Sequence, residues 1–207
     1  MSPTVTSVEK KGRGVLAVVM DDSEHPALLP IEAVILNRVH EGAEFTSTAW
    51  ETIRGEGAVL LATRRGLVLL SRKPHTERDL RKALVGDFLE IDVDRALERL
   101  HELGFLDDRA WSERYVAGQR AQTRGRSLLR TELRARGIAD DVTAAALDGR
   151  DELGAATEAA RKRMRSLRSI DDEERRKRRL YDFLRRRGFA DDVCRRASET
   201  ALAETEA

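Results

Sequence analysis

The side chains in this sequence that most readily suggest chemistry are three pairs of adjacent aspartates. They are Asp107-Asp108, Asp140-Asp141 and Asp191-Asp192. Paired carboxylates can hold the divalent cation of a metal-dependent nuclease. Each pair, however, stands where a helix is expected to begin, and there a carboxylate caps free backbone N–H groups. We therefore interpret the pairs as helix caps and expect no metal site.

Other catalytic arrangements are missing from the sequence. The histidines are scattered and show no metal-binding spacing; they are His25, His40, His75 and His101. The Gly-x-Gly segments at 12–14 and 55–57 are too short for a phosphate-binding loop. The single cysteine, Cys194, excludes an internal disulfide, and we interpret it as a small core residue. We expect no cofactor and no enzymatic activity.

Arginine is the residue type whose pattern suggests a function. The net charge is only +1, but the charges are segregated along the chain. Residues 109–136 contain eight arginines and two glutamates, and residues 161–187 contain thirteen bases and five acids. Each arginine taken singly fits a solvated face paired with neighbouring acids. The two blocks together favour an anionic partner, because arginine binds phosphates and carboxylates through paired hydrogen bonds.

The kind of anionic partner is narrowed by composition. Aromatic residues make up only 4% of the chain, too few to stack on a series of unpaired bases. No single helix has the pattern of a base-reading recognition helix. The basic blocks therefore favour contact with a nucleic-acid backbone or with an acidic groove of a protein.

The first part of the chain is expected to be rich in β-structure. Short β-branched runs at 4–8 and 14–20, and a third at 26–30, predict a hairpin or a three-stranded cap. A helix is expected to follow from Pro30 and to stop at Gly42. Farther on, Thr48 and Glu51 have the spacing of a capping box and predict the start of a second helix.

The rest of the chain repeats itself. The segments LRTELRARGIADDV (129–142) and LYDFLRRRGFADDV (180–193) match at an offset of 51, and a weaker copy begins at Leu80. Each copy predicts a helix, a glycine that ends it, an apolar residue that packs back across the joint, and a second helix. A connecting helix precedes the second and third copies. The repeat is thus a three-helix unit of about fifty residues, and tandem units should stack into an elongated array.

These patterns predict a mainly α fold with tandem three-helix repeats after a small β-rich N-terminal extension. We expect the extension at 1–62 and repeats at 63–108, 109–158 and 159–207, the last with the C-terminal tail. No apolar run is long enough to span a bilayer, and no signal peptide is recognisable. We therefore expect a cytoplasmic protein without membrane association, and a monomer.

Residues 104–138, GFLDDRAWSERYVAGQRAQTRGRSLLRTELRARGI, resemble the RecX family of recombinase regulators. The matching positions are Phe105, Asp107, Asp108, Trp111, Tyr115, Val116, Arg120, Gly125, Glu132, Leu133 and Gly137. Residues 69–84 also resemble the start of the family's first repeat. Ser127 stands where many members have proline, and the joint of the first repeat lacks the glycine found at Gly137.

The resemblance implies a modulator, mostly an inhibitor, of the RecA recombinase in DNA recombination, repair and the SOS response. Such proteins lie along the groove of the RecA–DNA filament, contact more than one protomer, and suppress ATP hydrolysis, strand exchange and coprotease activity. Single- and double-stranded DNA are expected as further partners through their phosphates. The residues expected to bind are Tyr115, Arg120, Arg124, Arg126, Arg130, Arg175, Arg176, Arg178, Arg179 and Arg186.

Two alternatives remain at this point. For Tyr115, a place in the core is the competing interpretation, because it adjoins Val116 at helical spacing. For the whole chain, the competing function is a stand-alone DNA-binding protein or transcriptional regulator. A protein that binds only phosphates would lose affinity steeply as salt increases, and it would bind naked duplex DNA as well as the RecA–DNA filament. These two properties would distinguish it from a RecA regulator. A nuclease has no supporting residues.

Overall fold

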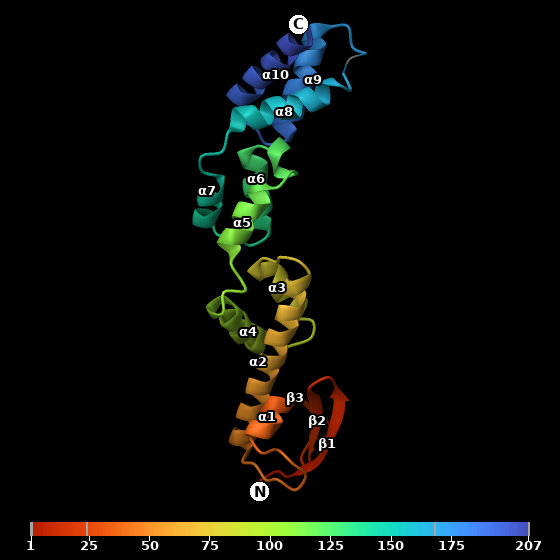
Figure 1. The fold of residues 1–207 in the computed structure, drawn as a ribbon, viewed down its shortest axis with the longest axis vertical. Coiled ribbons are helices and arrows are strands. Elements are labelled where there is room, and N and C mark those ends of the chain that lie inside the picture. Colours follow the sequence, from red (N-terminus) through yellow and green to blue (C-terminus); the bar gives the residue numbers. More distant parts are fainter. Residues whose placement is uncertain (1, 24, 168, 207) are drawn as a thin grey trace. The chain divides into compact units, whose positions relative to one another are not determined.

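The computed structural model describes residues 2–23, 25–167 and 169–206, and the chain forms two compact units, Met1–Leu106 and Asp107–Ala207 (Figure 1). The described residues form ten α-helices, one short 3-10 helix and a three-stranded sheet. The predicted mainly helical fold with a β-rich N-terminal part is therefore confirmed. No helix in the described ranges is both long and apolar enough to cross a membrane.

The sheet of the first unit is antiparallel and follows chain order. Its strands are β1 (Val5–Gly12), β2 (Val15–Met20) and β3 (Ala27–Pro30). Residues on one face, among them Val18 and Leu29, are fully buried against Trp50 and Ile53. The sheet thus gains its stability by packing against a helix, as a small sheet must. Figure 1 shows it beside the N-terminal half of α2.

The helices that follow the sheet differ from the prediction. Helix α1 (Ile31–Leu36) ends well before Gly42, because the chain turns at Arg38, which has a φ of 52°. Helix α2 (Ser47–Arg72) begins after Thr46, whose hydroxyl accepts a hydrogen bond from the Ala49 N–H at 3.2 Å. The capping box predicted for Thr48 and Glu51 is therefore wrong. The division expected between residues 62 and 63 falls inside this continuous helix.

The second half of α2 packs against two shorter helices, α3 (Glu77–Leu84) and α4 (Glu90–Glu102). Gly66 lets α4 approach closely, because a Cβ at this position would lie 2.7 Å from a methyl carbon of Leu100. The shared core holds buried leucines and valine, namely Leu80, Leu84, Val93, Leu97 and Leu100. A single helix thus serves two cores, one with the sheet and one with α3 and α4.

The second unit contains two groups of three helices. Its helices are α5 (Asp108–Ala117), α6 (Arg126–Ala135), α7 (Asp140–Leu147), α8 (Glu152–Met164), α9 (Glu173–Arg186) and α10 (Asp191–Glu206), with the 3-10 helix η1 (Ala121–Thr123) between α5 and α6. In the first group Leu129, Leu133 and Leu147 are buried together. In the second, α10 packs along both α8 and α9 around Leu180 and Leu184 (Figure 1).

The repeated glycines end their helices as predicted. Gly137 and Gly188 have φ values of 84° and 82°, a conformation that glycine adopts without steric cost. The N–H of Phe189 then donates back to the Leu184 carbonyl at 3.3 Å, and the corresponding bond at the earlier copy ends on Leu133 at 3.1 Å. This pattern satisfies carbonyls that a helix end leaves free. The apolar residue after each glycine is buried across the joint.

The aspartate pairs do not all act as caps. Asp107 caps α5, because its carboxylate accepts a hydrogen bond from the Ala110 N–H at 2.9 Å. The capping prediction is wrong for Asp140, because Ala139 is the N-cap of α7 and provides no side-chain hydrogen bond. Asp140 instead binds Arg134 of α6 at 2.6 Å. Asp191 forms the equivalent ion pair with Arg185 of α9. The repeat thus carries an ion pair across each joint.

A contact between two glycines joins the two helix groups of the second unit. A Cβ added to Gly125, just before α6, would lie 2.1 Å from the carbonyl oxygen of Gly188, just after α9. The Gly125 N–H donates to the Arg187 carbonyl at 2.8 Å, and the Ser127 N–H donates to the Gly188 carbonyl at 3.2 Å. The free donors at the start of α6 are therefore satisfied by the chain that ends α9.

Polar side chains reinforce this joint. Arg187 donates to the Thr123 hydroxyl at 3.1 Å, and Arg150 donates to the carbonyls of Ala121 and Arg124 at 2.5 and 3.0 Å. Glu152 accepts a hydrogen bond from a backbone N–H of α6 at 2.8 Å. Burial raises the pKa of Glu152, with these contacts acting in the opposite direction. Backbone and side-chain hydrogen bonds therefore both hold the two helix groups together at the Gly125–Gly188 contact.

Substitution of Gly125 by alanine should disrupt the joint. The added methyl group meets backbone atoms that cannot move aside. We expect Gly125→Ala to lower the free energy of unfolding by about 1–3 kcal/mol, the usual cost of overpacking. The matched control is Gly55→Ala in α2, where nothing lies within 4 Å and a gain of about 0.5–1 kcal/mol is expected. Urea denaturation measures both, and equal stability of Gly125→Ala and wild type would contradict the joint.

Candidate anion-binding surface

Tyr115 lies inside a hydrogen-bonded network between α5 and α6. Its hydroxyl donates to Glu132 Oε2 at 2.8 Å, and Arg124 Nη1 donates to both carboxylate oxygens of Glu132 at 2.6 Å. The side chains of Arg124 and Glu132 are only 26% and 24% exposed. A partly buried, hydrogen-bonded ion pair of this kind holds its groups in place. Tyr115 and Arg124, two of the predicted contact residues, are therefore engaged within the chain.

The aromatic ring of Tyr115 also packs against neighbouring side chains. Trp111 and Tyr115 stack with their ring centroids 5.0 Å apart, and the Arg136 guanidinium lies 5.2 and 5.4 Å from the two centroids. Removal of the phenol from water raises the pKa of Tyr115, and its hydrogen bond to the Glu132 carboxylate raises it further. The network therefore favours the neutral, donating form of Tyr115.

Helix α9 carries four arginines that we call the α9 arginine stripe. They are Arg175, Arg178, Arg179 and Arg186. All four are exposed, and their side chains form no hydrogen bond or ion pair with another residue that the structure describes. At about 3.6 residues per turn they share the side of α9 opposite the buried Leu180 and Leu184. The stripe is thus a mainly positive surface, with the exposed Asp182 as an acid on the same side.

The remaining bases of the same block are engaged. Lys177 pairs with Glu199 of α10 at 3.1 Å, Arg185 pairs with Asp191, and Arg187 lies 4.9 Å from the centroid of Phe183. Arg176, another predicted contact residue, is half-buried and has interactions within the chain. Helix α10 thus supplies acids to this block from a distant segment of the chain.

Three predicted residues lie exposed in the first helix group of this unit. Arg120 forms no hydrogen bond or ion pair through its side chain within the described part of the chain. Arg126 and Arg130 stand on α6 one turn apart, and both act on neighbouring carboxylates through space. The Arg134 hydrogen bond, with a smaller contribution from Arg130, holds the pKa of Asp140 below its usual value.

No group of three or more His, Cys, Asp and Glu side chains in the described residues is placed to hold a metal ion. Cys194 is fully buried in the core of α8, α9 and α10, as a small core residue should be. Burial raises the pKa of its thiol to about 11. Its thiolate is therefore scarce at neutral pH, and the thiol is expected to be unreactive.

Comparisons with known proteins identify both helix groups of the second unit. Residues 107–147 match the family model for the second three-helix domain of RecX, and residues 150–197 match that for the third. The chain is 31% identical to a regulatory protein RecX of Chlorobaculum tepidum over 73% of this chain and 95% of the relative. It is 35% identical to one of Mycobacterium ulcerans over 67% of this chain and 81% of that protein.

Solved structures agree with these matches. A crystal structure of a regulatory protein RecX has a TM-score of 0.70 and 25% identity, and covers 92% of this chain and 96% of its own. RecX from Lactobacillus salivarius shares the fold, with a TM-score of 0.62 over 70% of this chain and 96% of its own. The matched three-helix domains and the relatives' name place this chain in a class of regulatory proteins. It is a member of the RecX family, as the sequence resemblance indicated.

Most residues that carry the family resemblance have structural roles. Tyr115 and Glu132 form the network, Gly125 forms the joint, and Gly137 ends a helix. Sequence reasoning did not find the residues that complete the joint, Arg150, Glu152 and Arg187. Their partners lie 26 or more residues away along the chain. No local pattern marks them.

The network makes a prediction for the titration of Tyr115. In the folded chain the pKa of Tyr115 lies above its usual value of 10.0. The stability that this provides is present below about pH 10 and is lost as the pH rises toward the folded pKa. We expect the absorbance titration of tyrosinate to show a step above pH 10 in the wild type, and Tyr115→Phe to remove that step. A higher step that survives in Tyr115→Phe would contradict the network.

Proposed function

We propose that this protein is a negative regulator of RecA that lies in the groove of the RecA–DNA filament. In that position it suppresses ATP hydrolysis, strand exchange and coprotease activity. Family membership supports a regulatory role, and the known relatives carry the name regulatory protein RecX. The proposal adds the partner and the mode of action to that coarser statement. It needs no catalytic group of its own.

The single observation that carries the proposal is the α9 arginine stripe. Its four guanidinium groups have no hydrogen-bonding partner among the described residues and form one exposed surface. Each guanidinium can bind a phosphate or a carboxylate through two hydrogen bonds. A RecA–DNA filament would offer both, phosphates from its DNA and carboxylates from its protomers. We propose that the stripe, with Arg120, Arg126 and Arg130, supplies the main contacts.

The two basic regions of the second unit, on its two helix groups, could contact successive protomers of a filament. The joint at Gly125 and Gly188 fixes α6 relative to α9, so the arginines of both helix groups are presented together. Several weak contacts to successive protomers would then add to a strong overall interaction. We propose the division 1–62, 63–108, 109–158 and 159–207 as a division of function only, because its first boundary lies within helix α2 and its last within helix α8. Tyr115 and Arg124 are better assigned to the fold than to the contact surface.

A stand-alone DNA-binding protein remains the second candidate, because the same stripe would neutralise phosphates of naked DNA. Four phosphate contacts give a logarithmic salt dependence with a slope of about −3.6. In that case duplex DNA and the filament would bind equally well at any one salt concentration. A preference for the filament at fixed salt supports the first proposal instead.

Charge reversal in the stripe should weaken filament binding. We expect Arg178→Glu combined with Arg179→Glu to weaken binding to RecA–DNA filaments by about tenfold or more, because a charge-assisted hydrogen bond contributes about 1.5–3 kcal/mol. The matched control combines Arg78→Glu and Arg99→Glu, two exposed arginines of the first unit without an ion pair in the described chain. Fluorescence anisotropy with labelled filaments measures both. Equal loss in both variants would reject the stripe as the contact.

The regulatory activity is tested with the RecA of the same organism. Single-stranded-DNA-dependent ATP hydrolysis is titrated with wild-type protein and with the stripe variant. We expect inhibition by wild type and a shift of the titration midpoint by about tenfold or more in the variant, matching the lost affinity. Inhibition well below one molecule per protomer indicates action at filament ends, and inhibition near saturation indicates coating of the groove. Unchanged hydrolysis with tight binding to naked DNA would favour the second candidate.

A further inference from the structure

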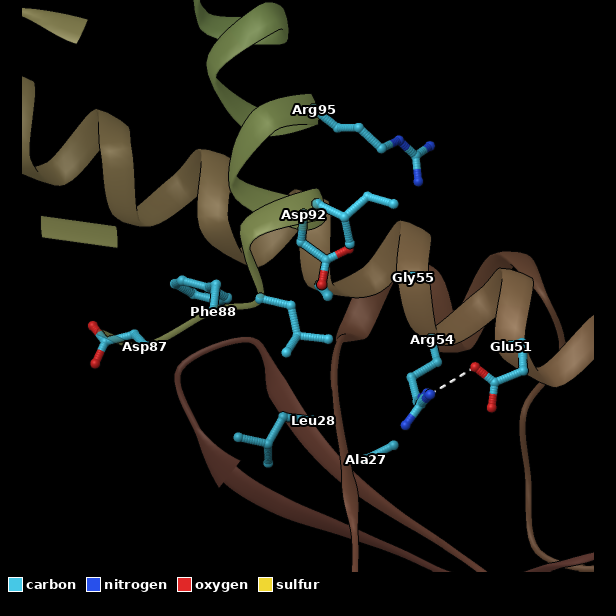
Figure 2. A pocket seen from close by; sticks show the side chains of 12 residues that line it. Ala27, Leu28, Glu51, Arg54, Gly55, Asp87, Phe88, Asp92 and Arg95 are labelled. Carbon is cyan, nitrogen blue, oxygen red and sulfur yellow. Dashed lines mark hydrogen bonds and ion pairs between the residues drawn. The ribbon is translucent and has the colours of Figure 1, made fainter. Parts of the chain in front are cut away.

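The first unit contains a pocket on its surface. The pocket has a volume of about 440 Å³ and is lined by β3, the first half of α2, and the segment that enters α4 (Figure 2). A volume of this size is typical of ligand-binding sites, about 300–1,000 Å³. All of its lining residues belong to residues 27–95, within one compact unit.

The edge of the pocket is formed by aliphatic side chains that protrude into solvent. Leu28 is 51% exposed, Leu89 is 70% exposed and Ile91 is 67% exposed. Among the described residues, every large apolar side chain of comparable exposure lies in residues 28–105, and none lies in the second unit. Clustered apolar side chains at the edge of a pocket mark a binding surface, because covering them releases about 25 cal/mol for each Å² of apolar area.

The pocket also contains a carboxylate without a partner, on a residue that is itself largely buried. Asp92, in the first turn of α4, is only 8% exposed, and its side chain forms no hydrogen bond or ion pair with a residue that the structure describes. Figure 2 shows its carboxylate directed into the pocket, between α4 and Gly55 of α2. The start of a helix is an electrostatically favourable place for a negative charge. A carboxylate that faces a pocket and lacks a partner can form a charge-assisted hydrogen bond with a basic side chain.

The other acidic side chains that line the pocket have ion-pair partners, whereas Asp92 has none among the described residues. Arg54 pairs with Glu51 at 2.6 Å, and Asp87 pairs with Arg65 at 3.7 Å. Arg95 extends from α4 into solvent, away from the Asp92 carboxylate (Figure 2). The pocket therefore combines one available negative charge at its base with an apolar edge.

We propose that this pocket binds a protein segment that presents a lysine or arginine side chain between aliphatic ones. The basic group would pair with Asp92, and the aliphatic side chains would cover Leu28, Leu89 and Ile91. Three exposed apolar side chains edge the pocket, so a peptide chain covers them better than a small cation does. This pocket would bind a positively charged group, whereas the α9 arginine stripe would bind an anion. The site therefore goes beyond the proposed function and does not depend on it.

The test uses the full chain, labelled with ¹⁵N, and three capped pentapeptides. The first is Ala-Leu-Lys-Leu-Ala, and the others replace its lysine by norleucine or glutamate. We expect the lysine peptide to shift the amide signals of Leu28, Gly55 and Phe88 and to bind about tenfold or more tightly than the norleucine peptide, since a hydrogen bond to a charged group contributes about 1.5–3 kcal/mol. The glutamate peptide should bind most weakly.

Two variants assign the effect to the proposed contacts. Asp92→Asn keeps the shape of the side chain and should remove the preference for lysine over norleucine. Glu90→Gln is the matched control, because Glu90 lies in the same helical turn but does not line the pocket. Ile91→Ser should weaken both peptides, and melting temperatures verify that each variant folds.

Several outcomes would overturn the proposal. They are equal binding of the lysine and norleucine peptides to wild type, amide shifts that map elsewhere, no binding at the solubility limit, or a lysine preference that survives Asp92→Asn. Self-association of the chain that Ile91→Ser abolishes would assign the pocket to a second copy and also overturn it. None of these outcomes depends on RecA, so the proposed function is tested separately.

Discussion

The backbone contact between Gly125 and Gly188 is the constraint on which the second unit depends. A left-handed turn ends α9 and places the Gly188 carbonyl where the start of α6 needs an acceptor. Any side chain at Gly125 would occupy the space of that carbonyl. Backbone hydrogen bonds at the joint are screened by salt far less than surface ion pairs are. The two helix groups therefore keep their relation under conditions that weaken the surrounding ion pairs.

Arginine has two separate uses in this chain. Arg134 and Arg185 form ion pairs across the turns at Gly137 and Gly188. Arg124 donates hydrogen bonds to Glu132, and Arg187 donates to Thr123 of η1. The guanidinium groups of these side chains form hydrogen bonds within the chain. Arginines without such partners are left on the outer side of α9. A count of basic residues overstates the surface available to a partner, and pairing in the folded chain determines which of them remain.

The sequence predicts local features of this fold well and long-range contacts poorly. The two glycine turns follow from a repeat of leucines, glycine and an apolar residue, because every group involved lies within a few positions. The role of Asp140 was misjudged because a nearby arginine competes with the free N–H groups of the helix start. The contact of Arg187 with Thr123 spans 64 residues, and only the folded chain brings these residues together.

The same limit applies to function. The basic blocks are visible in the sequence, but their division into structural and available arginines depends on acids supplied by other helices, such as Glu199. Asp92 looks like an ordinary first-turn acid, and its isolation becomes evident only when β3 and α2 surround it. The two units thus expose opposite chemistries. Salt weakens contacts of the arginine stripe with a polyanion, whereas it leaves apolar contacts at Leu28, Leu89 and Ile91 intact. Binding through one unit can therefore persist where binding through the other is lost.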